Sequence, residues 1–107
     1  MAETAALSDK IHVLDFLKTN KRDLARFKVR KLGLFGSYFR GQQTEKSDID
    51  FLVEFEEGKK TFDNFIGLVD YLESAFGKEV ELVTKEAVSK HILPYIEKEI
   101  AYVKIVD

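Results

Sequence analysis

The segment 47–55, SDIDFLVEF, restricts the fold of this chain more than any other stretch, because it is typical of a buried strand that begins with two acids. Side chains two residues apart on a strand project from the same face, so Asp48 and Asp50 point together while Ile49 turns to the other face. Two carboxylates held this close repel each other when both are ionised, and a divalent cation removes that repulsion. The segment therefore predicts a strand that carries half of a metal–phosphate site.

A Gly-Ser pair, Gly36-Ser37, precedes this strand, with ten residues between Ser37 and Asp48. It ends the stretch VRKLGLFG, which predicts a strand, and residues 37 to about 41 predict a short turn or helix. Glycine lets a phosphate approach the backbone, and the free N–H groups at the start of a helix attract anions. Arg40 can reach the same anion. Each half alone is a common structural feature, whereas the combination favours a nucleoside triphosphate site with magnesium on the two acids.

Two helices are predicted from capping residues and apolar spacing. Ser8 is positioned to cap a helix with Ile11, Leu14 and Leu17 on one face. Thr61 is positioned to cap another, which ends before Gly77. The apolar stripe of this second helix follows the helical period and consists of Phe62, Phe65, Ile66, Val69, Leu72 and Phe76.

The rest of the chain continues the alternation of helix and strand. Residues 78–84 and 101–106 predict strands, Thr84 is positioned to cap a short helix over 85–92, and Pro94 to open a further helical turn through Glu99. We therefore expect an α+β fold, with a small mixed β-sheet of about four strands and helices packed on it, forming one domain over residues 1–107.

Composition excludes several classes of protein. The chain has no cysteine, so a disulfide framework or a thiolate metal site is ruled out. The N-terminus lacks the pattern of a signal peptide, and no run approaches the roughly 20 apolar residues that span a bilayer. We expect a soluble, cytoplasmic protein. The net charge of −2 gives no reason to expect direct nucleic-acid binding. One basic stretch, 18–31, is either a solvated surface, a docking surface for an acidic partner or a positive rim for phosphates.

The spacing of Gly36-Ser37 and Asp48-Ile49-Asp50 resembles the signature of the nucleotidyltransferase superfamily with the DNA polymerase beta-like fold. More closely, residues 31–103 resemble the minimal nucleotidyltransferase (MNT) group. The resemblance implies the nucleotidyltransferase fold and an enzyme that uses ATP and Mg²⁺. Members often pair with a HEPN-domain protein as a toxin–antitoxin module, in which the MNT antitoxin can transfer AMP to a tyrosine of the HEPN toxin.

The resemblance also implies roles for individual residues. Gly36 and Ser37 would bind the triphosphate, Arg40 would neutralise phosphate charge, and Asp48 and Asp50 would ligate two Mg²⁺ ions. The family usually has a third carboxylate, an Asp, on the neighbouring strand, where this chain has Glu81. The extra methylene moves that carboxylate by roughly 1 Å, and a misplacement of this size can cost about 100-fold in rate. The alternative for Glu81 is an exposed strand residue paired with a nearby lysine.

Three functions follow, in order of preference. The first is an Mg²⁺-dependent adenylyltransferase that acts as an antitoxin and modifies a HEPN partner. The second is a catalytically weak or inactive binding module that neutralises its partner by occlusion, which the change from Asp to Glu81 suggests. The third is an aminoglycoside-type transferase that modifies a small molecule. A core this small leaves little to recognise an acceptor, so we expect a partner chain and leave a homo-oligomer open.

Overall fold

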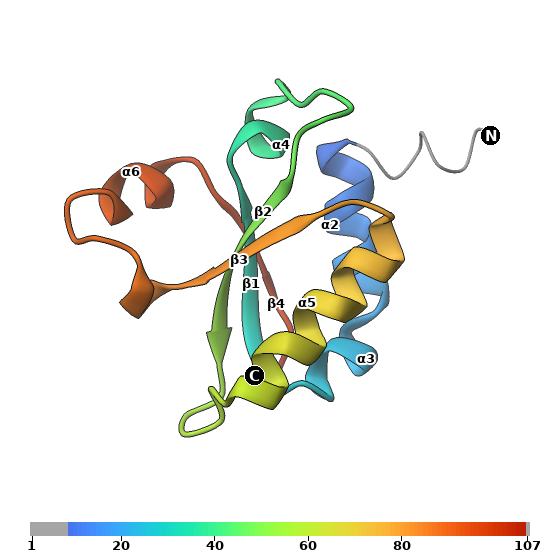
Figure 1. Cartoon of the computed structure of the whole chain (residues 1–107), viewed down its shortest axis with the longest axis vertical. Coiled ribbons are helices and arrows are strands. Elements are labelled where there is room, and N and C mark those ends of the chain that lie inside the picture. Colours follow the sequence, from blue (N-terminus) through green and yellow to red (C-terminus); the bar gives the residue numbers. More distant parts are fainter. Residues whose placement is uncertain (1–8, 107) are drawn as a thin grey trace.

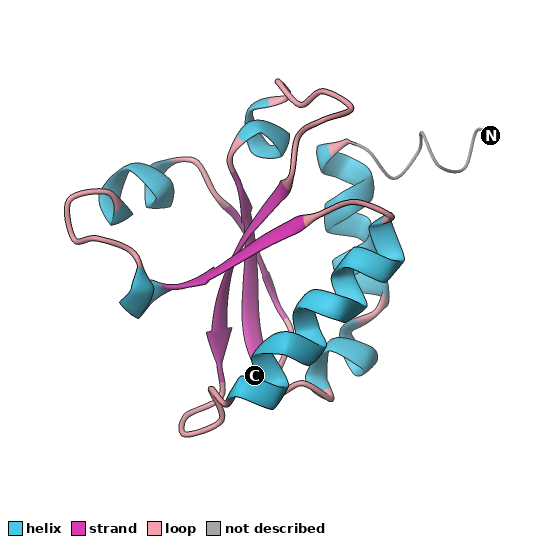
Figure 2. Cartoon of the chain, in the orientation of Figure 1, coloured by secondary structure: helices cyan, strands magenta, loops and turns pink. Residues whose placement is uncertain are grey.

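The computed structural model describes residues 9–106, which form a four-stranded sheet with helices on both of its faces (Figures 1 and 2). The strands are β1 (Val29–Phe35), β2 (Ile49–Phe55), β3 (Val80–Thr84) and β4 (Ala101–Lys104). The helices are α2 (Lys10–Thr19), α3 (Lys21–Ala25), α4 (Ser37–Arg40), α5 (Phe62–Phe76), the 3₁₀ turn η1 (Lys85–Ala87) and α6 (Leu93–Lys98).

The sheet is mixed, as predicted, with the strand order β3-β2-β1-β4. β1 is antiparallel to both β2 and β4, whereas β2 and β3 run parallel. Parallel strands need a crossover connection, and α5 supplies it. The final strand β4 returns to pair with β1 and forms one edge of the sheet, while β3 forms the other.

The core lies on one face of the sheet, between the strands and the helices α2, α3 and α5 (Figure 1). Alternation along β2 places Ile49, Phe51 and Val53 on this face, where each is at most 2% exposed. α6 lies on the other face (Figure 1). That second face carries Asp50, Leu52 and Glu54, and is called the open face below.

α2 is capped by Asp9, whose side chain accepts a hydrogen bond of 2.9 Å from the backbone N–H of His12. The predicted cap, Ser8, lies outside the described residues. The predicted apolar face was also wrong in part, because Ile11 is 75% exposed while Val13 and Leu17 are buried. Apolar residues with helical spacing can be grouped into more than one stripe on α2. The way the helix docks on the sheet decides which stripe is buried.

α5 has the predicted ends. Thr61 accepts a hydrogen bond of 3.1 Å from the backbone N–H of Asn64, and Gly77 ends the helix in the left-handed conformation with φ 64°. Leu72 and Phe76 are buried as predicted, but Ile66 is 39% exposed and Phe62 is 77% exposed. Phe62 lies in the first turn, where the helix extends beyond the sheet.

Three strand boundaries and one helix differ from prediction. β2 begins at Ile49, because the hydroxyl of Ser47 instead accepts a hydrogen bond of 2.8 Å from the backbone N–H of Thr44 and closes a turn. β3 begins at Val80 and β4 ends at Lys104. The helix predicted over residues 85–92 is only the short turn η1, without a side-chain cap from Thr84. α6 begins with Pro94 in its first turn, as predicted.

None of the helices within residues 9–106 is both long enough and apolar enough to cross a bilayer.

Candidate functional site

Asp50 lies at the start of β2 with its side chain on the open face, while its neighbours Ile49 and Phe51 are fully buried on the other. The alternation predicted from the sequence is therefore present. Asp48 precedes the strand and is exposed, and its charge acts on Asp50.

Glu81 is the partner of Asp50 across the parallel strands β2 and β3. Residues opposite each other on neighbouring strands project from the same face, so the two carboxyls meet on the open face. Burial raises the pKa of Asp50 from 3.8 to about 6, with contributions from the charge of Glu81, a hydrogen bond between the two side chains and the charge of Asp48. The other two acids predicted for the site, Asp48 and Glu81, thus both act electrostatically on Asp50.

The Gly-Ser turn lies directly against this carboxylate. Gly36 has φ 76° and ψ −152°, a conformation open essentially to glycine alone, and Ser37 begins α4 immediately after it. Phe35, the last residue of β1, pairs with Asp50. A side-chain carbon added to Gly36 would collide with Oδ2 of Asp50. The turn predicted to bind phosphates and the acids predicted to bind metal are therefore in van der Waals contact.

Arg40, at the end of α4, acts electrostatically on the site. Its positive charge lowers the pKa of Asp50, whereas burial and the two other acids raise it. Its side chain is held by two polar partners. Nε donates a hydrogen bond of 3.1 Å to Gln42, and the guanidinium forms an ion pair of 3.7 Å with Glu99. Glu99 follows α6, so this pair links the Gly-Ser turn to the helix on the open face.

The carboxylates fit a hard cation, although they do not form a complete cage. Among residues 9–106, no group of three or more acidic, histidine or cysteine side chains is arranged to hold a metal ion by itself. The repulsion that raises the pKa of Asp50 is the feature that a divalent cation would relieve. Mg²⁺ usually takes one or two carboxylates and completes its shell with water and substrate phosphates, which suits Asp50 and its neighbours.

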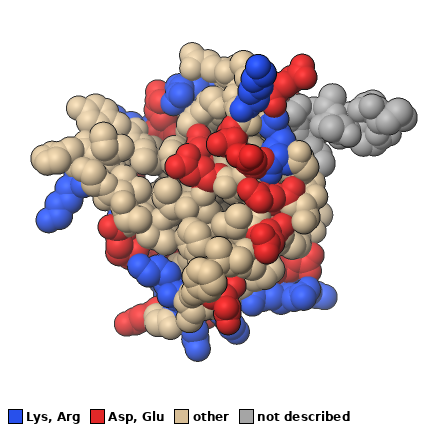
Figure 3. Space-filling view, in the orientation of Figure 1, with Lys and Arg blue, Asp and Glu red and all other residues tan. Residues whose placement is uncertain are grey.

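Acidic side chains gather on the upper part of the molecule in the view of Figure 3, around the starts of β2 and β3. Within residues 9–106, Arg40 is the only cation that acts on Asp50, so a triphosphate that approached without a bound metal ion would be repelled by the acids. The site is therefore suited to a metal–nucleotide complex rather than to a free polyanion.

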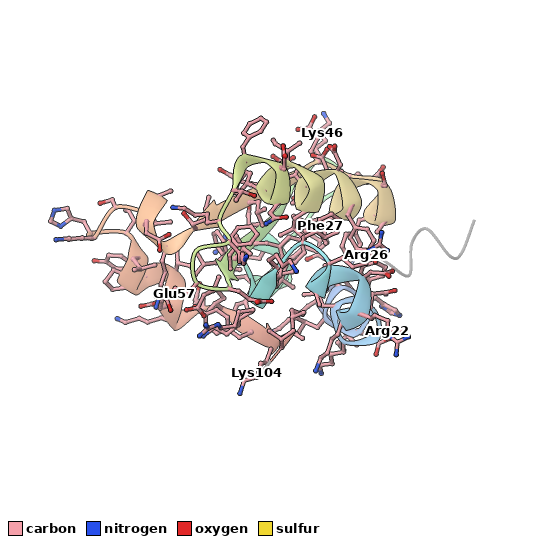
Figure 4. The ribbon with its side chains drawn as sticks, turned by 90° about the horizontal axis from the view of Figure 1, so that it is seen from below. Arg22, Arg26, Phe27, Lys46, Glu57 and Lys104 are labelled. Carbon is pink, nitrogen blue, oxygen red and sulfur yellow. The ribbon has the colours of Figure 1, made fainter. Side chains whose placement is uncertain are left out.

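The basic stretch 18–31 does not form a rim for phosphates. Its strand portion starts at Val29, which pairs with Phe55, at the opposite end of β1 from Gly36. Arg22 and Arg26 point outward on the α3 side of the molecule (Figure 4), and Lys31 lies on the open face in an ion pair of 3.7 Å with Glu54. A docking surface for an acidic partner stays a prediction.

Two further features concern the surroundings of the site. Tyr38, next to Ser37, packs in the core as its place in the short helix suggests, and its buried hydroxyl has no hydrogen-bond partner among residues 9–106. Glu99 was treated only as the end of a helical turn, yet it pairs with Arg40. No local pattern could reveal this ion pair, since it depends on α6 folding back over the sheet.

This mixed sheet, with a Gly-Ser turn packed against acids on two parallel strands, defines a nucleotide-handling domain of the nucleotidyltransferase class. The profile of the nucleotidyltransferase domain family matches residues 14–106. The chain belongs to that family.

Relatives and solved structures agree with this assignment. The protein adenylyltransferase MntA of Thermococcus cleftensis is 43% identical over 88 residues, which cover 81% of this chain and 88% of the relative. A solved structure described as a minimal nucleotidyltransferase matches with a TM-score of 0.64 and 30% identity, covering 82% of this chain and 93% of the other. A toxin–antitoxin complex with AMP-PNP matches with a TM-score of 0.61 and 27% identity, covering 78% and 71%.

Proposed function

We propose that this protein transfers AMP from ATP to a hydroxyl group of a partner protein, at the site where β2 begins. One observation carries the proposal: Asp50 meets Glu81 across parallel strands and lies directly against Gly36. That arrangement places carboxylates for a metal beside a backbone suited to phosphate. The adenylyltransferase MntA, which is 43% identical, supports ATP as the donor.

In this proposal, Gly36 and Ser37 hold the triphosphate, and Asp48, Asp50 and Glu81 hold two Mg²⁺ ions. When bound, the ions would neutralise phosphate charge and favour ionisation of the acceptor hydroxyl. Arg40 turns from Glu99 toward the phosphates, since a phosphate is the more highly charged partner for a guanidinium.

The transfer itself is an in-line displacement at the α-phosphorus. The acceptor oxygen forms a bond to that phosphorus, the bond from it to the bridging oxygen of the β-phosphate breaks, and pyrophosphate leaves. The acceptor hydroxyl loses its proton to solvent. The chain contributes positioning and charge neutralisation, which are the main sources of catalysis in phosphoryl and nucleotidyl transfer.

We propose a HEPN-domain toxin as the acceptor, with this chain as its antitoxin. The resemblance to the MNT group supports this pairing, as does the similarity to a toxin–antitoxin complex that contains AMP-PNP. Modification of the toxin would then neutralise it covalently.

Occlusion without catalysis is the second candidate. It is favoured by Glu81, whose side chain is one methylene longer than the Asp usual in the family. The double variant Asp48→Asn/Asp50→Asn separates the two candidates: under occlusion it still neutralises the toxin at stoichiometric amounts, and under catalysis it does not.

Intact-mass measurement tests the main proposal. The chain is incubated with saturating ATP, Mg²⁺ and a purified HEPN partner, and the partner is expected to gain the mass of AMP. Asp48→Asn/Asp50→Asn should abolish the gain, while Asp70→Asn, an exposed position on α5, should leave it unchanged. An unmodified partner with the wild-type chain would contradict the proposal.

A further inference from the structure

A hollow of about 590 Å³ opens beside β2, at the opposite end of the strand from Asp50. It exists because β3 pairs with β2 only as far as Val53, opposite Thr84, whereas β2 continues to Phe55. The chain turns away into η1 at that point. The edge of β2 beyond Val53 therefore has no pairing with β3 and forms one wall of the hollow. The remaining walls come from the loop after β2 and from η1.

A second, smaller hollow continues this one along the open face. The two share Val53, Glu54 and Lys85 in their walls, and the second reaches Leu52. Leu52 follows Asp50 on the same face of β2, by the alternation of the strand. The two hollows adjoin at these shared residues and are together called the β2 groove below, which is wide near Glu57 and narrows to a hollow of about 10 Å³ beside Leu52.

The lining of the β2 groove carries both signs of charge. Lys60 and Glu86 form an ion pair of 3.6 Å, and Lys85 forms one of 3.5 Å with Glu97. Acids without such an ion pair add to the lining, among them Glu57, which lies on the α6 side of the molecule, away from Arg22 and Arg26 (Figure 4). A nucleic-acid backbone, with one negative charge per nucleotide, is poorly matched to such walls. A polypeptide with mixed polar side chains suits them.

We propose that the β2 groove binds an extended segment of the acceptor protein and delivers its hydroxyl side chain to Asp50. The edge of β2 beyond Val53, which β3 leaves unpaired, supplies backbone groups for strand addition at one end of the segment, and the rest of the segment lies over the open face toward Asp50. Asp50 and Glu56 are six positions apart in the sequence, a length of about 20 Å along a strand, so the bound segment spans about six residues. The inference rests on the proposed adenylyl transfer and specifies how its acceptor is recognised.

Steady-state kinetics give the first test. The charge swap Glu57→Lys/Lys85→Glu keeps the net charge of the protein and reverses the charge of two exposed residues that line the groove. It should raise KM for the acceptor protein at least ten-fold and leave KM for ATP within two-fold. The matched swap Asp70→Lys/Lys90→Glu, also exposed but outside the groove, should change neither. An unchanged KM for the acceptor in the groove variant would overturn the proposal.

Photocrosslinking gives the second test and does not depend on catalysis. The chain has no cysteine, so Glu57→Cys accepts a single benzophenone label. The label should crosslink to the acceptor within about ten residues of the modified hydroxyl, and a label at Lys90→Cys should not. Crosslinks to a second copy of this chain, to nucleic acid or to a distant part of the acceptor would overturn the proposal. If wild type transfers no AMP, the proposed function fails, while the crosslink still decides whether the groove binds the partner.

Discussion

Gly36 and Asp50 are packed so closely that a methyl group on the α-carbon of the glycine would fall on the carboxylate of the aspartate. The contact joins two parts of the motif that are separated in the sequence by α4 and a loop. It also explains why the spacing between them matters, because a shorter or longer connection would displace one group from the other.

Replacing Gly36 by alanine should destabilise the protein and disturb the site. The backbone conformation alone costs about 1–3 kcal/mol for a residue with a side chain, and Asp50 must also move. The free energy of unfolding from urea titration measures the loss. Gly41→Ala is the control for positive φ without a contact, because Gly41 has φ 71° in the left-handed helical region and open space around it, so it should lose less. Equal losses in the two variants would show that the contact with Asp50 is not tight.

Asp50 should make the metal-free protein more stable in mild acid. Its pKa is raised from 3.8 to about 6, so the folded state binds the proton more tightly than the unfolded chain does. The stabilisation is complete below about 3.8 and is lost as the pH rises through about 6. Because the carboxyl is only half-buried, we expect about 1 kcal/mol.

Urea unfolding in EDTA at pH 5 and pH 7.5 measures this effect. Other carboxyls titrate as well, so the comparison is with Asp50→Asn, which should lose the part of the pH dependence that Asp50 contributes. Identical pH dependence in the two proteins would contradict the assignment of the shift to Asp50.

Glu81→Gln should lower the pKa of Asp50 part of the way toward its ordinary value, since burial still raises it but the charge facing Asp50 across the strands is removed. Carboxyl carbon NMR over a pH titration reports this directly. Glu79→Gln is the control. Glu79 is an acid two residues before Glu81 and is not among the causes of the raised pKa of Asp50. An unchanged pKa of Asp50 would mean that the side chain of Glu81 points away from Asp50 in solution. That result would contradict the proposed role of Glu81 as a metal ligand.

The ion pair between Arg40 and Glu99 should tune nucleotide affinity rather than stability. The side chains are 3.7 Å apart and roughly half-exposed, so the pair contributes at most about 1 kcal/mol to folding. Glu99→Gln frees the guanidinium and should tighten binding of Mg²⁺–ATP several-fold by calorimetry, while Arg40→Ala should weaken it at least ten-fold. Glu97→Gln, which removes the ion pair with Lys85 and leaves that of Arg40 intact, should have no effect. Weaker binding by Glu99→Gln would show instead that the pair holds Arg40 in its working position.

The features that the sequence predicted correctly are local ones. The cap at Thr61, the left-handed glycine at Gly77 and the alternation around Asp50 each depend on residues a few positions apart. Ile11, Phe62 and Ile66 were wrongly predicted to be buried because the way each helix docks on the sheet decides which of its apolar residues are covered. The strand order, the ion pair of Arg40 and the β2 groove all require the tertiary arrangement, and no short-range pattern encodes them.

The parallel pairing of β2 with β3 has a consequence for how the protein folds. Gly36, Asp48 and Asp50 lie on a connection between antiparallel neighbours and can come together early, whereas Glu81 reaches Asp50 only after α5 has crossed over and closed a long loop. A nascent or partly unfolded chain would carry the Gly-Ser turn and two acids but not the third. The complete set of carboxylates is thus a property of the finished fold, and a chain caught halfway along its folding pathway would not yet possess it.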